Sequence, residues 1–228
     1  MNTVGSSVSL FGVADTAAYR EQFPSAGWNL PLDLPRAIVA AYPLSRAVLS
    51  TVDGAPNPLY FHHYRQVNYQ LDTAALEIAR GLEKEGFRAL PVAASQTLDA
   101  EDRTAHLSHR HMGYLAGLGW RGKCNLLVSP LLGAGIRLVT VLTDAPLPVS
   151  RPMADRDCGS CDRCAKACPA RAIGTDCAAF DLARCAALLS QFRTIPRVGQ
   201  RICGVCQRAC MEGGTWREHT ASRTASRP

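Results

Sequence analysis

The chain has 228 residues, of which 47% are hydrophobic, and its formal net charge is +6. This length allows one large core, or one large domain with a smaller one beside it. The sequence has no run of about 18 apolar residues, which argues against a membrane-spanning helix. The N-terminal segment lacks the basic and long apolar stretches of a secretory signal, so we expect a cytoplasmic protein without membrane attachment.

The first 150 residues predict strands that alternate with helices. Short apolar runs at residues 7–15, 36–44, 87–92 and 136–147 have the length and composition of strands. Between the second and third of these, apolar residues recur every three or four positions from Tyr60 to Leu82, which predicts a helix of seven or eight turns ending near Gly86. Residues 108–118 predict a second helix with Ser108 as its N-cap. This order indicates an α/β fold.

The ten cysteines are unevenly distributed along the chain. Nine of them lie between Cys158 and Cys210, and only Cys124 stands apart. Because the chain has no recognisable export signal, metal binding is a better interpretation than disulfide formation. A disulfide scaffold would also spread its bridges over the whole fold.

The spacing of the first run points to an iron–sulfur cluster. Cys158, Cys161, Cys164 and Cys168, followed by Pro169, form C-x2-C-x2-C-x3-C-P, the spacing of bacterial ferredoxins. Zinc is the competing metal, since pairs of C-x2-C also bind zinc. Three closely spaced cysteines followed by C-P are uncommon in zinc sites, so we favour iron and sulfur.

A second run supplies Cys203, Cys206 and Cys210, which is one ligand too few for a cluster of its own. In two-cluster ferredoxins the fourth cysteine of each run binds the other cluster. This rule predicts one site from Cys158, Cys161, Cys164 and Cys210. The other site takes Cys168, Cys203, Cys206 and either Cys177 or Cys185.

The C-terminal part of the chain is basic. From residue 193 to residue 228 there are seven arginines against two acidic residues. One interpretation is a nucleic-acid surface, which would make the protein a zinc-stapled binding module. The other is local neutralisation of the negative charge that thiolate-bound clusters carry. We favour the second, because the arginines are interleaved with the cysteines.

Residues 116–148, AGLGWRGKCNLLVSPLLGAGIRLVTVLTDAPLP, resemble the epoxyqueuosine reductase family. Family members carry a similar AGLGW-x-GK-x-x-LL motif, a strand ending in TD-x-PL, and then two ferredoxin-type runs. The family is related to the cobalamin-dependent reductive dehalogenases. The resemblance implies a nitroreductase-like α/β domain of the cobalamin-processing type at residues 1–150. A two-cluster ferredoxin-like α+β domain would follow at residues 151–216, with a polar tail at 217–228.

The resemblance also implies a function. Family members pass electrons through two [4Fe–4S] clusters to cobalamin and reduce epoxyqueuosine in tRNA. By this match Cys185 is the eighth cluster ligand. We therefore expect an iron–sulfur oxidoreductase that receives electrons from a ferredoxin or flavodoxin and delivers them through a corrinoid to a small or nucleoside substrate.

The sequence departs from the family pattern at three places. The chain stops soon after the second run, where full-length members have a helical extension that helps to hold tRNA, so we expect no tRNA binding. The position of the family's catalytic acid is occupied by Arg103, with Asp102 beside it. Met211 follows Cys210 where the family has proline. The absent acid supports an alternative function, a non-catalytic electron-transfer protein that reduces a partner protein.

The remaining candidate site residues have both functional and structural interpretations. The family match favours corrinoid contacts from the glycine-rich loop and from the strand that follows it; these residues are Gly117, Gly119, Trp120, Gly122, Lys123 and Asp144. The alternative is an ordinary turn. His109 and Tyr114 are candidate proton donors on the predicted second helix. Without the resemblance, both would be interpreted as packing residues.

Overall fold

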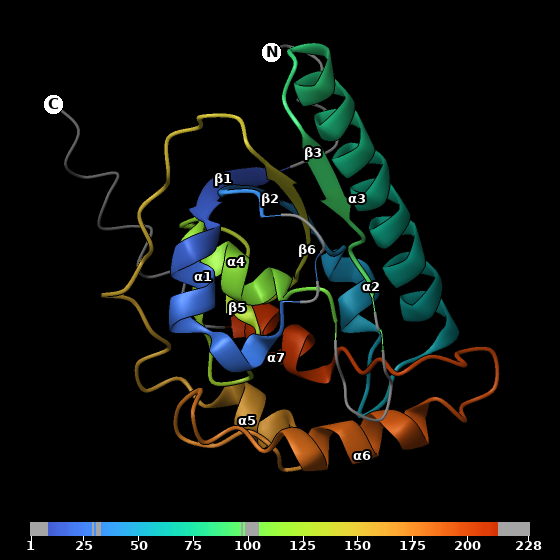
Figure 1. The fold of residues 1–228 in the computed structure, drawn as a ribbon. Coiled ribbons are helices and arrows are strands. Elements are labelled where there is room, and N and C mark those ends of the chain that lie inside the picture. Colours follow the sequence, from blue (N-terminus) through green and yellow to red (C-terminus); the bar gives the residue numbers. More distant parts are fainter. Residues whose placement is uncertain (1–8, 29, 31–32, 97, 99–104, 214–228) are drawn as a thin grey trace, which may run out of the picture. The chain divides into compact units, whose positions relative to one another are not determined.

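The structure is a computed structural model that describes residues 9–28, 30, 33–96, 98 and 105–213 (Figure 1). The chain forms two compact units, each assembled from segments that are separated in the sequence. Unit 1 comprises Met1–Tyr42, Val67–Trp120 and Arg137–Ala154, and unit 2 comprises Pro43–Gln66, Arg121–Ile136 and Asp155–Pro228. The tail expected at residues 217–228 and the position of the family's catalytic acid, residues 102 and 103, lie outside the described residues.

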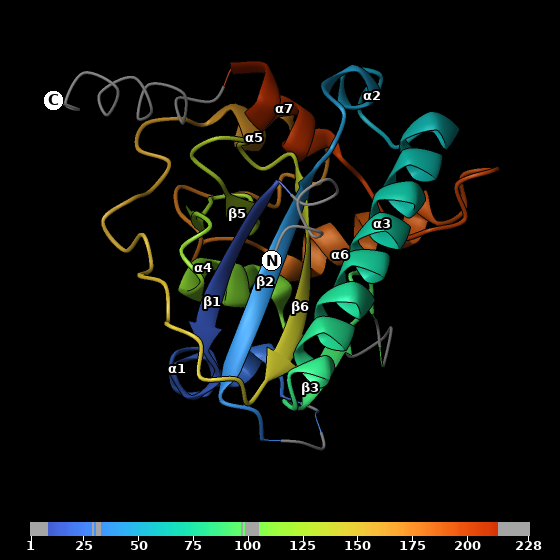
Figure 2. The same cartoon turned by 90° about the horizontal axis from the view of Figure 1, so that it is seen from above.

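Unit 1 is built on a four-stranded sheet with the order β1-β2-β6-β3 (Figure 2). Its strands are β1 (Leu10–Asp15), β2 (Arg36–Pro43), β3 (Ala89–Val92) and β6 (Ile136–Thr143). β1 and β2 are antiparallel, and β3 is antiparallel to β6. The inner strands β2 and β6 are mostly apolar, and β6 is covered on both faces, since Thr140, Val141 and Leu142 alternate between the faces and are all fully buried.

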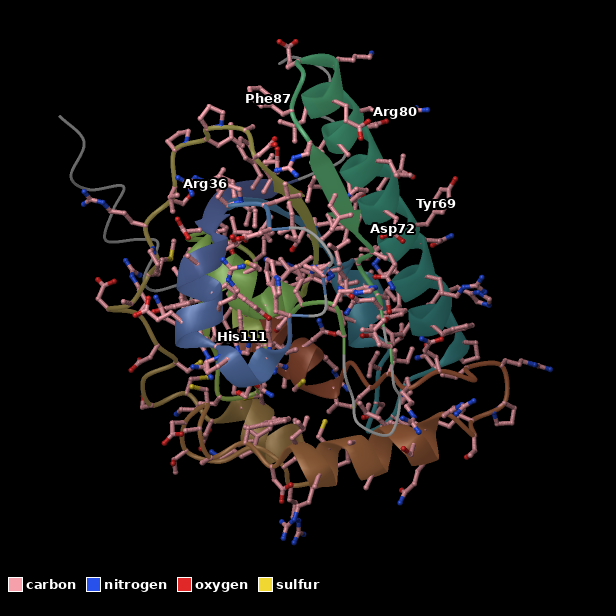
Figure 3. All side chains as sticks on the ribbon, viewed as in Figure 1. Arg36, Tyr69, Asp72, Arg80, Phe87 and His111 are labelled. Atoms are coloured by element: carbon pink, nitrogen blue, oxygen red, sulfur yellow. The ribbon has the colours of Figure 1, made fainter. Side chains whose placement is uncertain are left out.

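Three helices accompany this sheet. The helices α1 (Thr16–Gln22) and α4 (His109–Leu115) both contact β1, and they also contact each other. The long helix α3 (Pro58–Lys84) passes β3 and β6, where the Asp72 carboxylate accepts a hydrogen bond from the Ala94 N–H at 2.7 Å. Figure 3 shows Tyr69 extending outward from this helix, and Tyr69 is 75% exposed. The helix is therefore amphipathic, as its sequence period requires.

The elements predicted for this part of the chain are confirmed. The predicted strands correspond to β1, β2, β3 and β6, and the periodic segment forms α3. Gly86 has a φ of 86°, and the N–H of Phe87 donates to the carbonyl of Leu82, which is the hydrogen bond of a Schellman stop. Ser108 is the N-cap of α4 through its backbone carbonyl. The expected α/β fold class is confirmed.

Unit 2 contains the cysteine-rich segment and two earlier pieces of the chain. Its helices are α2 (Arg46–Ser50), the first turns of α3, α5 (Arg163–Ala167), α6 (Leu182–Phe192) and α7 (Val205–Gly213). A two-stranded sheet pairs β4 (Trp120–Arg121) with β5 (Leu127–Val128). The helices α5 and α2 both pack against α7.

This grouping differs from the linear division at residue 150 that the sequence suggested. Residues 43–66 and 121–136 pack with the cysteine-rich segment and not with the sheet. The physical reason is size, because about 60 residues with short helices cannot bury enough apolar surface to form a core alone. The borrowed segments supply buried side chains, including Leu49, Val52 and Tyr60. Within the described part of the chain, no helix is both long and apolar enough to cross a membrane.

Candidate metal centre

The helix α7 carries two of the predicted cluster ligands, Cys206 and Cys210. Residues four positions apart lie on the same face of a helix, so both thiols face the same side of α7. The buried Gln207 lies between them in the sequence. Its side-chain amide donates to the carbonyl oxygen of Ala134 at 3.0 Å and accepts from the Tyr60 hydroxyl at 2.9 Å. These hydrogen bonds fix the orientation of α7 about its own axis.

Two close contacts hold α7 in place along its length. Gly204 has a φ of 85°, and a Cβ there would lie 2.8 Å from the Tyr60 ring. A Cβ at Gly135 would lie 2.6 Å from the Met211 sulfur. Glycine at these two positions allows α7 to pack closely on the start of α3 and on the segment before β6. The structure thus fixes where Cys206 and Cys210 present their sulfurs.

The first predicted set of ligands comes together in unit 2. The N–H of Cys161 donates to the carbonyl of Cys158 at 3.1 Å, which closes a turn between them. Burial is the main cause that raises the pKa of the Cys210 thiol to about 12, and charge repulsion from the three thiols of the first run contributes to this value. The N–H of Ala134 donates to the Cys210 sulfur at 3.4 Å and opposes that shift. Cys210 thus lies beside the first run, although more than 40 residues separate them in the sequence.

Three thiols predicted for the second set, among them Cys185, influence one another's pKa. Burial raises the pKa of the Cys203 thiol to about 11, with a further contribution from Cys185 and Cys168. Burial also raises the pKa of Cys185, and Cys168 adds to that shift. These mutual interactions place Cys168, Cys185 and Cys203 near one another. They favour Cys185 over Cys177 as the fourth member of the set.

None of the ten cysteines forms a disulfide, so each is a thiol that carries a proton before it binds metal. Metal binding would displace these protons, since thiolates are the ligating form. Among the described residues, no three Cys, His, Asp or Glu side chains converge on a point that could hold a single metal ion. A cubane cluster makes a different demand, because each of its four irons takes one thiolate.

The predicted proton donor His109 is held by two hydrogen bonds in unit 1. Its Nε2 lies 2.8 Å from the carbonyl oxygen of Ala93, and its Nδ1 lies 2.8 Å from the Thr140 hydroxyl. A carbonyl only accepts, so Nε2 carries the proton and Nδ1 accepts from Thr140. Burial lowers the pKa of His109 to about 4. These contacts favour a structural role over proton donation at neutral pH.

The other candidate on α4, Tyr114, packs against an aromatic pair. Its ring meets that of Phe23 edge-on, with centroids 6.2 Å apart. Phe23 also stacks on the His111 ring, with ring centroids 4.2 Å apart. His111, labelled in Figure 3, lies on α4 with Tyr114. The Tyr114 side chain is only partly buried, so its hydroxyl remains a candidate donor.

The residues predicted to contact a corrinoid are divided between the two units. In unit 1, Gly117 has a φ of 71°, and a Cβ there would lie 2.6 Å from the carbonyl oxygen of Arg151. Gly119 is buried in the same turn, and Trp120 is 1% exposed. In unit 2, a Cβ at Gly122 would lie 2.5 Å from the Val128 side chain. Close packing inside each unit is thus enough to explain why positions 117 and 122 are glycine.

The two charged residues of the predicted corrinoid set also have protein partners. The Lys123 ammonium donates to the carbonyl oxygens of Gly159 at 2.7 Å and Cys161 at 3.1 Å, so it contacts the first cysteine run. Asp144 accepts from both the backbone N–H and the guanidinium of Arg88, each at 2.8 Å. The Arg88 guanidinium lowers the pKa of the Asp144 carboxyl. A corrinoid contact from either residue stays a prediction.

The sequence analysis missed two residues of this centre. Gln207 orients α7 between the two sets, but a single glutamine among cysteines gives no pattern to recognise. Cys124 is 5% exposed, and the side chains of Cys164 and Cys206 both act on its pKa, which is raised overall. No sequence signal could locate this interaction, because Cys124 lies more than 30 residues before the first run.

Comparison with known proteins identifies relatives by sequence. No protein-family model matches the chain. The epoxyqueuosine reductase of Aliivibrio fischeri is 31% identical over 173 residues, covering 68% of this chain and 43% of that protein. The epoxyqueuosine reductase of Synechococcus sp. (strain RCC307) is 38% identical over 120 residues, covering 48% of this chain and 34% of that protein. The matched region thus spans less than half the length of these relatives.

Solved structures share the fold. A catabolic reductive dehalogenase in complex with 3-bromo-4-hydroxybenzoic acid superposes with a TM-score of 0.63 at 17% identity, covering 89% of this chain and 29% of that one. An epoxyqueuosine reductase with an epoxyqueuosine-modified tRNA-Tyr stem loop superposes with a TM-score of 0.54 at 21% identity, covering 93% of this chain and 63% of that one.

The α/β sheet and the assembled cysteines define a chain with the fold shared by reductive dehalogenases and epoxyqueuosine reductases. The sequence comparison is more specific than the fold. It confirms the resemblance expected from the AGLGW motif, and the chain is a homologue of the epoxyqueuosine reductases.

Proposed function

We propose that this chain is an iron–sulfur oxidoreductase that passes electrons through two [4Fe–4S] clusters to a corrinoid and then to a small or nucleoside substrate. The observation that carries the proposal is that thiols of the two runs influence one another in unit 2, as Cys210 and the first run do, and as Cys203 and Cys168 do. Such exchange of the fourth ligand is the arrangement of two-cluster ferredoxins. Homology to proteins named as reductases supports a catalytic role over simple electron carriage.

The proposed ligands follow from the contacts of the thiols. One cluster takes Cys158, Cys161, Cys164 and Cys210, and the other takes Cys168, Cys185, Cys203 and Cys206. The donor chemistry fits, because all eight are reduced cysteines and iron–sulfur clusters bind thiolates. A bound cluster accepts and releases single electrons. One ligand of each proposed set, Cys206 and Cys210, lies on α7, which would keep the clusters close to each other.

Corrinoid binding rests on the resemblance and on a structural neighbour, a reductive dehalogenase described in terms of B12-dependent dehalogenation. In this proposal the backbone around Gly117 and Gly119 approaches the corrinoid, and the substrate proton comes from Tyr114. His109 then positions α4, since both of its ring nitrogens are occupied within the protein. The electron donor would be a ferredoxin or flavodoxin.

The substrate class is part of the same proposal. A related structure contains a tRNA stem loop, which makes a modified nucleoside one candidate. The alternative function, a non-catalytic electron-transfer protein, shares the two clusters but needs no corrinoid. The two functions therefore differ in a property that can be measured directly.

Anaerobically reconstituted protein should be incubated with cobalamin, desalted, and examined by ultraviolet–visible spectroscopy. We expect retained corrinoid bands together with the broad brown absorbance of the clusters. Full cluster absorbance without any retained corrinoid in the unmodified protein would refute the corrinoid step and favour the electron-transfer alternative.

A further inference from the structure

The loop that joins α6 to α7 carries three arginines at intervals of four residues. Arg193, Arg197 and Arg201 are all exposed, and we call residues 193–201 the arginine loop. Figures 1 and 2 both show this segment extending away from the two helices that it joins. Between residues 182 and 211 the chain contains five arginines and no acidic residue. The arginine loop is therefore a basic surface without acidic residues in the adjoining sequence.

Buried apolar side chains hold the arginine loop in place. Val198 is 2% exposed and Ile202 is 6% exposed, and each directly follows an arginine. The backbone closes tight turns, since the N–H groups of Val198 and Gly199 both donate to the carbonyl of Ile195, at 3.1 and 3.3 Å. The loop thus has a defined shape, and its arginines face solvent while its apolar side chains are buried.

Arg197 has a left-handed backbone conformation, with a φ of 66°. This conformation is unfavourable for most residues that carry a Cβ, whereas glycine adopts it freely. Glycine does adopt it two positions later, at Gly199, where φ is 60°. Folding alone would therefore be served better by glycine at position 197. A strained arginine on an exposed loop indicates a role outside folding.

The two cysteine runs differ in the charge around them. Residues 155–167, around the first run, contain three acidic and three basic residues. Residues 168–206, which include most of the second set, contain five arginines and two acidic residues. These two acids, Asp176 and Asp181, accept hydrogen bonds from backbone N–H groups two or three residues further along the chain. The chain is thus positively charged around the second set and balanced around the first run.

The arginine loop is close in the chain to two proposed ligands of the second cluster. Cys185 lies on α6, eight residues before Arg193, which is about 12 Å along the helix axis. Cys203 follows Arg201 by two residues. A protein bound to the arginine loop would therefore lie near the cluster that these cysteines would hold.

We propose that the arginine loop docks an acidic electron-carrier protein, which delivers electrons to the second cluster. In each encounter the carrier is oxidised by one electron, the cluster is reduced by one electron, and no bond forms or breaks. Electron-transfer partners form small interfaces, and opposite charge raises their rate of encounter. Neutralising a cluster would not require the arginines to face solvent. Two proposed cluster ligands flank the loop, which favours an electron carrier over a nucleic acid as the anionic partner.

This inference rests on the proposed function, because it requires the clusters, and it makes the second cluster the point of electron entry. The test uses an acidic plant-type [2Fe–2S] ferredoxin and anaerobically reconstituted protein. Binding is measured at low and at high salt, and the rate of cluster reduction by the reduced ferredoxin is measured by stopped flow. We expect salt to weaken binding to the unmodified protein, because it screens exposed charges.

Arg193→Glu and Arg197→Glu, made separately, should each weaken binding at low salt by about tenfold and slow cluster reduction by a similar factor. Arg80→Glu is the matched control, since Arg80, labelled in Figure 3, is exposed on α3 in unit 1 and the change in charge is the same. It should leave binding and cluster reduction nearly unchanged. All three variants should keep the iron content of the unmodified protein.

Arg197→Asn separates docking from folding. Asparagine tolerates a left-handed φ, so this variant should unfold at a urea concentration no lower than that of the unmodified protein. It should nevertheless bind ferredoxin more weakly, because it lacks the charge. Weaker binding accompanied by a loss of stability would show that Arg197 serves the fold, and it would contradict the proposed role.

Equal affinity in the unmodified protein and both glutamate variants would overturn the inference. Loss of iron from both glutamate variants would also overturn it, since the arginines would then serve the clusters and not a partner. Weaker binding of a tRNA stem loop by these variants, with unchanged ferredoxin binding, would show a nucleic-acid surface instead. Absence of clusters from the unmodified protein would refute the proposed function and this inference together, a result distinct from unchanged binding.

Discussion

Replacing His109 should change the pH dependence of folding stability. This change tests whether His109 has a structural role, as its hydrogen bonds indicate, or donates a proton. The structure gives it a folded-state pKa of about 4, against an ordinary value of 6.5. The unfolded chain therefore takes up a proton on His109 before the folded chain does. The stability that His109 contributes is fully present above pH 6.5 and is lost as the pH falls through 6.5 towards 4.

The magnitude follows from the two pKa values. Integrating proton uptake between them gives a loss of about 2 kcal/mol in the free energy of unfolding at pH 5, relative to pH 7. His109→Gln removes the titration, while its amide can still accept from Thr140 and donate to the Ala93 carbonyl. The difference in stability between the unmodified protein and His109→Gln should therefore shift by about 2 kcal/mol over this range, in favour of the variant at pH 5.

Urea unfolding of both proteins, at several pH values from 7 to 5, measures this difference. Clusters and other titrating groups contribute equally to both proteins and cancel. His62→Gln is the control for the loss of a histidine from the surface, because His62 is exposed on α3. A constant difference for His109→Gln as well would show that His109 is not buried as a neutral residue, and proton donation would regain support.

Three further predictions concern the cysteine centre. Tyr60→Phe leaves the buried side-chain amide oxygen of Gln207 without its donor, so it should lower the free energy of unfolding by about 1–3 kcal/mol, measured in urea. No change would contradict the role of Gln207 in fixing α7. Gly204→Ala puts alanine at a left-handed φ and in contact with the Tyr60 ring, so it should lower stability by more than Gly199→Ala, where the added Cβ meets open space. Equal losses would argue against close packing of Gly204 on Tyr60. Cys185→Ala should lose about half of the bound iron, whereas Cys177→Ala should keep all of it; the reverse result would exchange their roles.

The long elements of this fold could be predicted because they repeat a pattern many times. The helix α3 shows its apolar period over six turns, and β2 and β6 are apolar runs bounded by turn residues. The short helices α1 and α2 were missed, since five to seven residues are too few to show a helical period. In α1, Asp15 is a side-chain N-cap, but it also ends a strand, so its sequence context pointed to a turn.

The candidate centre could be predicted where the spacing of the cysteines itself indicates a type of metal site. The two runs gave seven of the eight proposed ligands, and the resemblance selected Cys185, which the structure places near Cys168 and Cys203. The surroundings of Cys124 and Gln207 were not predictable, because they depend on packing between distant segments. The grouping of residues 43–66 with the cysteine-rich segment was also not predictable, because local sequence does not show which core a segment packs into.

The central claim is that eight cysteines of unit 2 hold two [4Fe–4S] clusters. The most direct test is quantification of iron and acid-labile sulfide per chain in anaerobically reconstituted protein, with electron paramagnetic resonance of the dithionite-reduced sample. The account predicts about eight iron atoms and eight sulfides per chain, with spectra of two interacting reduced [4Fe–4S] clusters. A colourless protein that binds zinc, or about four iron atoms in a single cluster, would contradict it.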